Sequence, residues 1–190
     1  MIMHCINEAE KQLLKDIIGQ NLICFKSQKP DAWNHVFGNI AIIAENLEIE
    51  IRNELTPTEY FGDSEDISRF YVKQISEERP FRLMVDDSVV KTVVNEKVSD
   101  ILIVQDSVTV RDSNGALVYE IAIDTAIVIK TEKSTFAISR DWSLEELLVF
   151  VKTANFENDI YSVQQMIEEW SDEEELWTAS CDRKNISLIT

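Results

Sequence analysis

The sequence predicts an α+β protein dominated by mainly antiparallel strands, forming a sheet, a sandwich or a partly open barrel. Short apolar or alternating stretches follow one another from residue 22 to residue 139, with turn residues between them and no intervening helices. An amphipathic pattern precedes them, and acidic stretches with apolar residues at helical spacing follow residue 141. No linker, repeat or low-complexity segment interrupts the chain. We therefore expect one domain over 1–190, with a helix and β-rich body over 1–140 and an acidic helical segment over 141–190 packed on it.

The first element is an amphipathic helix predicted over residues 7–18. Asn7 is a suitable N-cap, and Glu10 follows three residues later, which is the spacing of a capping box. Gly19 can adopt the left-handed conformation that ends a helix.

The next elements are strands. Leu47, Ile49 and Ile51 alternate with charged residues, which is typical of a strand with one solvated face. Asp112–Gly115 is the clearest turn, so its flanking strands must pair antiparallel. Pro57 indicates a short helical turn near residue 56. The expected strands are 22–26, 39–44, 47–51, 67–75, 81–85, 89–94, 98–104, 108–111, 116–123, 126–131 and 135–139.

The last elements are predicted to be helices that cover the sheet. Ser143 and Glu146 have capping-box spacing, which predicts a helix to about residue 151. Residues 157–177 carry an apolar stripe that includes Trp170 and Trp177. Ser171 and Glu174 form another capping-box pair, at which this helix can break and restart.

Composition excludes several functions. The chain has 35 acidic and 18 basic residues, a net charge of −17, which disfavours nucleic acid as a partner. Its four glycines form neither a dinucleotide-binding motif nor a phosphate-binding loop. The three cysteines include no CxxC pair, there is no signal-peptide pattern, and no apolar stretch is long enough to span a bilayer. We expect a cytoplasmic protein with reduced thiols, no membrane contact and no cofactor.

Candidate catalytic and metal-binding residues are sparse. Cys24 and His35 could form a thiol–imidazole pair, although Cys24 lies in an apolar stretch typical of a buried strand. Asp63, Glu65 and Asp66 could bind a hard cation, but the spacing of a calcium loop is absent and a solvated loop is the preferred interpretation. No hydrolase, metalloprotease or kinase motif is present. We therefore expect a protein without catalytic or metal-binding residues.

The C-terminal quarter is unusually acidic. Residues 141–190 carry 12 acidic and 3 basic residues, and no basic residue lies between Lys152 and Arg183. Such a run is either a solvated face or a surface for a basic partner. These two interpretations remain open. The candidate partner-binding residues are Glu168, Glu169, Asp172, Glu173, Glu174 and Glu175, with Trp177 as an aromatic anchor.

These observations favour a non-catalytic interaction protein that binds and neutralises a basic protein, as immunity proteins, antitoxins and defence inhibitors do. One alternative is a β-barrel or sandwich that encloses a small molecule, because stretches such as 101–104 are continuously apolar. Another is an assembly component of phage or secretion machinery, in which sheet edges would pair between copies of the chain. Self-association is therefore left open.

Overall fold

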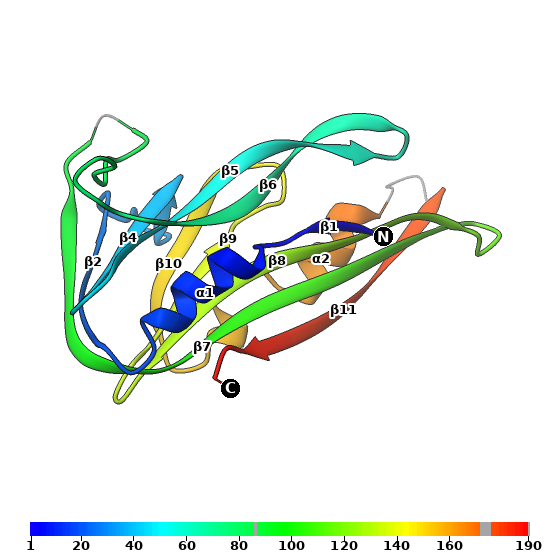
Figure 1. Cartoon of the computed structure of the whole chain (residues 1–190). Helices are drawn as coiled ribbons and strands as arrows, with labels where there is room; N and C mark the ends of the chain where they lie inside the picture. The colour runs from blue at the N-terminus through cyan, green and yellow to red at the C-terminus, as the bar shows by residue number, and fades with distance from the viewer. Residues whose placement is uncertain (86, 172–175, 190) are drawn as a thin grey trace.

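The computed structural model describes residues 1–85, 87–171 and 176–189, and most of them lie in strands (Figure 1). Helix α1 spans Glu8–Asp16, α2 spans Val163–Trp170, and a 3-10 turn covers Phe156–Asn158. The strands are β1 (Ile2–His4), β2 (Asn21–Ser27), β3 (His35–Phe37), β4 (Asn39–Ala44), β5 (Glu48–Tyr60), β6 (Asp63–Gln74), β7 (Val90–Asp112), β8 (Leu117–Thr131), β9 (Thr135–Arg140), β10 (Leu147–Thr153) and β11 (Trp177–Ser187). No helix among these residues is long and apolar enough to cross a membrane.

All the strands belong to one open sheet with the order β3-β10-β9-β8-β7-β2-β4-β5-β6. Two strands lie off this path: β1 pairs with β8 in parallel, and β11 pairs with β7 antiparallel. The long strand β7 joins the two halves of the sheet. Its first part, from Val90, pairs with β2, and its later part pairs with β8 on one side and β11 on the other.

The turns between strands form where side chains bond the turn backbone or where residues adopt positive φ angles. Asp112 accepts hydrogen bonds from the backbone of Asn114 and Ala116, which closes the turn between β7 and β8. The β5–β6 hairpin closes through Phe61 and Gly62, and Tyr60 pairs with Asp63. Both central residues have positive φ angles, 50° and 92°, as a type I′ turn requires.

Helix α1 lies between the β5–β6 side and the β7–β8 side of the bent sheet (Figure 1). It begins with a capping box in which the Asn7 side chain accepts from the Glu10 backbone and the Glu10 carboxylate accepts from the Asn7 backbone. Leu14 and Ile17 pack into a core with Phe25, Phe70 and other fully buried side chains from both halves of the sheet. One apolar core cluster therefore joins α1 to strands from both halves of the sheet.

The helical content differs from the prediction. The N-terminal helix is limited to nine residues instead of the expected range 7–18. The predicted helix that begins at Ser143 is wrong, because the β-rich stretch Leu147–Thr153 pairs with β9 and β3 as strand β10. Ser143 bonds the Glu169 carboxylate instead of capping a helix.

The prediction of one helix over 157–177 is also wrong. Among the described residues of this range the α-helix covers Val163–Trp170, with a capping box between Ser162 and Gln165. The chain then continues as β11, a strand that was not expected. The helical turn expected near Pro57 is part of β5. Proline is tolerated there because β4 pairs with β5 only as far as Arg52, so this stretch has a strand on one side alone.

Candidate protein-binding surface

The structure places the residues that were predicted to contact a partner in different environments. Glu168 is exposed on α2 and accepts a hydrogen bond from Gln164 at 2.8 Å. Glu169 is largely inside, where its carboxylate accepts from the Ser143 backbone at 3.0 Å and from the Ser143 hydroxyl at 3.2 Å. Trp177 is half-buried at the start of β11. Asp172, Glu173, Glu174 and Glu175 lie outside the described residues.

An aromatic cluster joins the C-terminal segment to the rest of the sheet. Its members are Tyr60, Phe61, Tyr119, Trp170 and Trp177. Trp177 stacks on Phe61 with ring centroids 5.2 Å apart, and Phe61 stacks on Tyr119 at 4.7 Å. Tyr119 in turn stacks on Trp170 at 5.6 Å. The cluster therefore connects the tip of the β5–β6 hairpin, strand β8, helix α2 and the start of β11.

The hairpin tip is held in place by this cluster. The Tyr119 hydroxyl donates to the backbone carbonyl of Glu59. Phe61 occupies a left-handed backbone conformation that a bulky residue rarely adopts, at a cost of roughly 1 kcal/mol or more. Stacking on two rings offsets this cost, since each aromatic pair contributes about 0.5–1.5 kcal/mol. The cost is therefore consistent with a tip that is fixed by tertiary packing rather than by turn preference.

The same hairpin carries a second acidic run. No lysine or arginine lies between Arg52 and Arg69, and Glu59, Asp63, Glu65 and Asp66 are all exposed. We call these four residues, together with Glu120 of β8 and Glu168 of α2, the acidic end. They belong to elements that meet at the right of Figure 1, where the hairpin tip, α2 and the start of β11 gather. The run from Arg52 to Arg69 could have been noticed in the sequence, but its position beside α2 could not.

Tyr60 lies near carboxylates of two separate elements. Burial raises the pKa of Tyr60, and the charges of Glu169 on α2 and Glu65 on β6 raise it further. Tyr60 therefore lies within the field of both acidic runs.

A groove of about 320 Å³ opens beside the cluster, between the hairpin tip and β8. Phe61, Tyr119, Leu117 and Val118 line it, and Leu117 is 56% exposed. The carboxylate-bearing residues Glu59 and Glu120 also line it. Met1 also lines the groove, and its N-terminal ammonium group lies 3.6 Å from the Glu120 carboxylate, so a cation of the chain itself already occupies one side of the groove.

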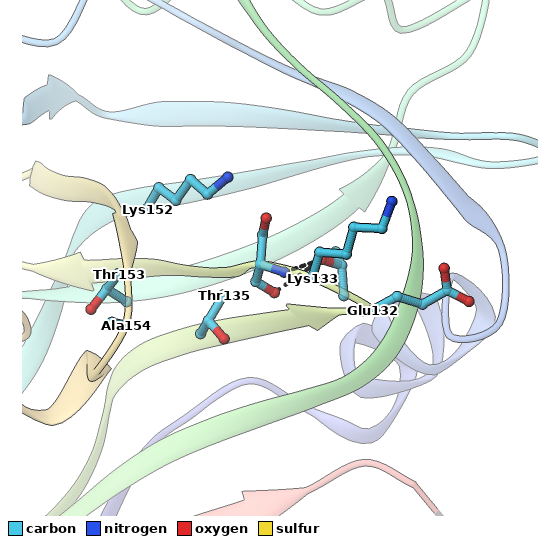
Figure 2. Close-up of a pocket in the computed structure, with 8 residues that line it drawn as sticks. Glu132, Lys133, Thr135, Lys152, Thr153 and Ala154 are labelled. Carbon is cyan, nitrogen blue, oxygen red and sulfur yellow. Dashed lines mark hydrogen bonds between the residues drawn. The ribbon is translucent and has the colours of Figure 1, made fainter.

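The opposite end of the molecule has a different character. A groove of about 560 Å³ lies beside the turn between β8 and β9. Figure 2 shows Glu132, Lys133 and Lys152 among the residues that line it. The Glu96 carboxylate accepts from the hydroxyls of Thr131 and Ser134, so it is held by the turn. Lysine side chains therefore line this groove together with the carboxylate of Glu132.

Buried polar groups lie between the two ends. Arg140 is fully buried and donates to the Asp124 carbonyl from Nε at 3.1 Å and from Nη2 at 2.7 Å, and to the Ser68 hydroxyl at 3.2 Å. Asp106 is also fully buried and forms a bidentate pair with Arg183 at 2.7 and 2.6 Å. Burial raises the pKa of Asp124 and of Glu169. These groups hold β6, β7, β8, β9 and β11 in register.

Cys5, Cys181 and His4 have pKa shifts that do not suit nucleophilic catalysis. Burial raises the pKa of Cys5 and of Cys181 to about 12, whereas a catalytic thiol has a lowered pKa. Burial lowers the pKa of His4 to about 4, with Nε2 3.0 Å from the Ile67 carbonyl. Cys24 packs with Ala41 and Ile43 in a core cluster.

The other candidates are explained by local structure. His35 of β3 bonds the Asp31 carboxylate at 3.2 Å, so its contacts differ from those of Cys24. Asp63, Glu65 and Asp66 are exposed along β6. In the described part of the chain, no three His, Cys, Asp or Glu side chains are grouped so that they could hold a metal ion. All three cysteines are free.

Comparison of the chain with protein-family models, with curated proteins and with solved structures finds no match.

Proposed function

We propose that this protein is a non-catalytic binding protein whose acidic end recognises a basic protein surface. The observation that supports this proposal is the aromatic cluster, which packs the β5–β6 hairpin with its exposed acidic residues against the C-terminal segment. A run of acidic residues that only faced solvent would not need aromatic rings packed beside it. Aromatic anchors surrounded by charge are typical of residues that dominate binding energy in interfaces.

The finer form of this proposal is neutralisation of a basic effector, as in an immunity protein or an antitoxin. Carboxylates at the acidic end would steer the partner and set the association rate. The part of the groove beside Glu59 would receive a lysine or arginine side chain, with the ring of Phe61 or Tyr119 against its stem.

The test compares three forms of the protein as bait in extract of the native cell. The first is the wild type. The second carries Glu59→Gln, Asp63→Asn, Glu65→Gln and Asp66→Asn. The third is a matched control that removes the same number of charges from exposed positions elsewhere in the molecule, with Glu45→Gln, Glu77→Gln, Glu78→Gln and Glu132→Gln.

We expect a basic protein to be recovered by the wild type and by the matched control at low salt, and to be lost with the acidic-end variant and at high salt. With the partner purified, the acidic-end variant should lower the association rate constant about tenfold or more and leave the dissociation rate less affected. Equal recovery of that protein by all three forms would contradict the proposal, because the charge would then act without regard to position.

A further inference from the structure

The edge of the sheet formed by β11 has a second feature that the proposed function does not use. Strand β11 pairs with β7 over its whole length, from Trp177 opposite Asp112 to Ser187 opposite Leu102. Within the described residues, no strand pairs with its other side. It forms the lower border of the sheet in Figure 1. Natural sheets rarely leave a long edge open, because its free N–H and C=O groups are a template for another strand.

The direction of the backbone groups can be read from two hydrogen bonds. The Leu188 N–H donates to Ile101 of β7, so even-numbered residues face β7. The Ala179 N–H instead donates to the Ser171 hydroxyl at 3.1 Å. Odd-numbered residues therefore face the open side. The edge is covered at Ala179, and Cys181, Arg183 and Asn185 follow it with their backbone groups turned outward.

The side chains on β11 alternate in the same way. Arg183 turns inward to the Asp106 carboxylate, whereas Asp182 and Lys184 are 75% and 64% exposed. Asp182 and Lys184 lie on the solvated side with opposite charges, two residues apart. If a second copy of the strand is placed antiparallel with Arg183 opposite Arg183, each Asp182 therefore lies opposite a Lys184.

We propose that two copies of this chain pair antiparallel through β11, with the two-fold axis at Arg183. In this register Cys181 lies opposite Asn185 of the second copy, and Asp182 lies opposite its Lys184. Each hydrogen-bonded pair of residues exchanges two backbone hydrogen bonds. The two sheets would then be continuous.

Charge selects this register over its neighbours. A shift of the axis to Asp182 would place two Asp182 carboxylates directly opposite each other, and a shift to Lys184 would do the same with two ammonium groups. Like charges directly opposite each other are destabilising in a cross-strand pair, whereas opposite charges contribute about 0.2–1 kcal/mol. Of these three positions, only an axis at Arg183 places opposite charges in both symmetry-related pairs of Asp182 and Lys184.

The experiment is a charge swap followed by analytical ultracentrifugation of the full chain, at protein concentrations from micromolar to millimolar. Physiological salt limits the repulsion between two chains of charge −17, because the Debye length is then about 8 Å. The wild type should form a dimer. Asp182→Lys and Lys184→Asp should each raise the dimer dissociation constant about tenfold, because each converts two attractive pairs into repulsive ones. The double variant D182K/K184D should restore dimerisation, since it exchanges the partners.

Asn185→Pro is the backbone variant. It removes an N–H that faces the open side and leaves the ladder with β7 intact, so the chain should fold and be monomeric. Circular dichroism and thermal unfolding monitor folding of every variant. A wild type that stays monomeric at millimolar concentration would overturn the proposal, as would a double variant that dimerises no better than the single ones. The acidic-end variant should dimerise normally, so this result is separate from that of the proposed function.

Discussion

Arg140 is a charged side chain that the fold holds with backbone and hydroxyl oxygens rather than with a direct ion pair. Burial lowers its pKa to about 10, while the charges of Glu169, Asp124 and Asp106 oppose that change. Its planar guanidinium reaches two elements at once, since it bonds the Asp124 carbonyl on β8 and Ser68 on β6. A lysine could supply the charge but not this geometry.

We therefore predict that Arg140→Lys lowers the free energy of unfolding by about 2–3 kcal/mol, because buried acceptors lose their donors. Urea unfolding measures the change. Arg111→Lys is the control: Arg111 is exposed and donates to the Gly115 carbonyl, so its replacement should change stability by less than about 0.5 kcal/mol. Equal effects of the two substitutions would contradict the role assigned to Arg140.

His4 makes stability depend on pH. Its pKa is about 4 in the folded protein and 6.5 when unperturbed, so the unfolded chain binds the proton more tightly. Stability from this residue is present above pH 6.5 and is lost as pH falls toward 4, by up to about 3 kcal/mol. Asp124 and Glu169 act in the opposite direction, because their raised pKa values favour the folded state as pH falls.

The prediction is that His4→Gln removes part of the loss of stability between pH 6.5 and pH 4. The free energy of unfolding is measured at half-unit pH steps for both proteins, and the difference between the two curves isolates the imidazole from the carboxylates. If the two curves run parallel over this range, His4 does not titrate as its burial requires.

At the scale of elements, the β5–β6 hairpin shows how packing can override turn preference. Asn-Gly is the preferred pair for a type I′ turn, yet the chain has Phe61-Gly62 there. The Phe61 ring is therefore used for contact with Tyr119 and Trp177.

Replacement Phe61→Asn should relieve the backbone and lose the stacking, so we expect the free energy of unfolding to change by no more than about 1–2 kcal/mol. The hairpin tip should become mobile, which tryptophan fluorescence and amide hydrogen exchange at Thr58–Ser64 would report. Unchanged exchange in this segment would show that turn geometry alone fixes the tip.

The strands were more predictable from the sequence than the helices. The turn at Asp112–Gly115 and most strand residues of β7 and β8 follow turn residues and alternation, which are local signals, although three separate strands were expected where β7 lies and two where β8 lies. The C-terminal helices were mispredicted because capping-box spacing is also local and carries no information on tertiary partners. Ser143 has that spacing, yet its partner is Glu169, and the stretch after it joins a sheet edge. The acidic end illustrates the same limit, since pairing between distant segments creates it.

At the scale of the whole molecule, charge opposes folding. The acidic side chains that give the net charge of −17 repel one another in the compact state. The carboxylates of the acidic end concentrate this repulsion at one place. Salt screens such repulsion.

Raising sodium chloride from about 20 mM to about 300 mM should therefore raise the unfolding temperature of the wild type by a few degrees. The variant with Glu59→Gln, Asp63→Asn, Glu65→Gln and Asp66→Asn should gain less from salt and be more stable at low salt. Differential scanning fluorimetry gives both values, and the variant with Glu45→Gln, Glu77→Gln, Glu78→Gln and Glu132→Gln is the control for position. A salt response identical in all three proteins would place the repulsion elsewhere.

The pairing of β11 with β7 also has a consequence for synthesis on the ribosome. Strand β7 leaves the exit tunnel long before β11, so its edge from Leu102 to Asp112 has no partner while the intervening chain is made. Strand β1 likewise has no pairing partner until β8 has been synthesised, because β8 lies far along the sequence. Such distant pairings slow folding and prolong the exposure of strand edges. The nascent chain should therefore depend on chaperones that shield open edges until β11 emerges.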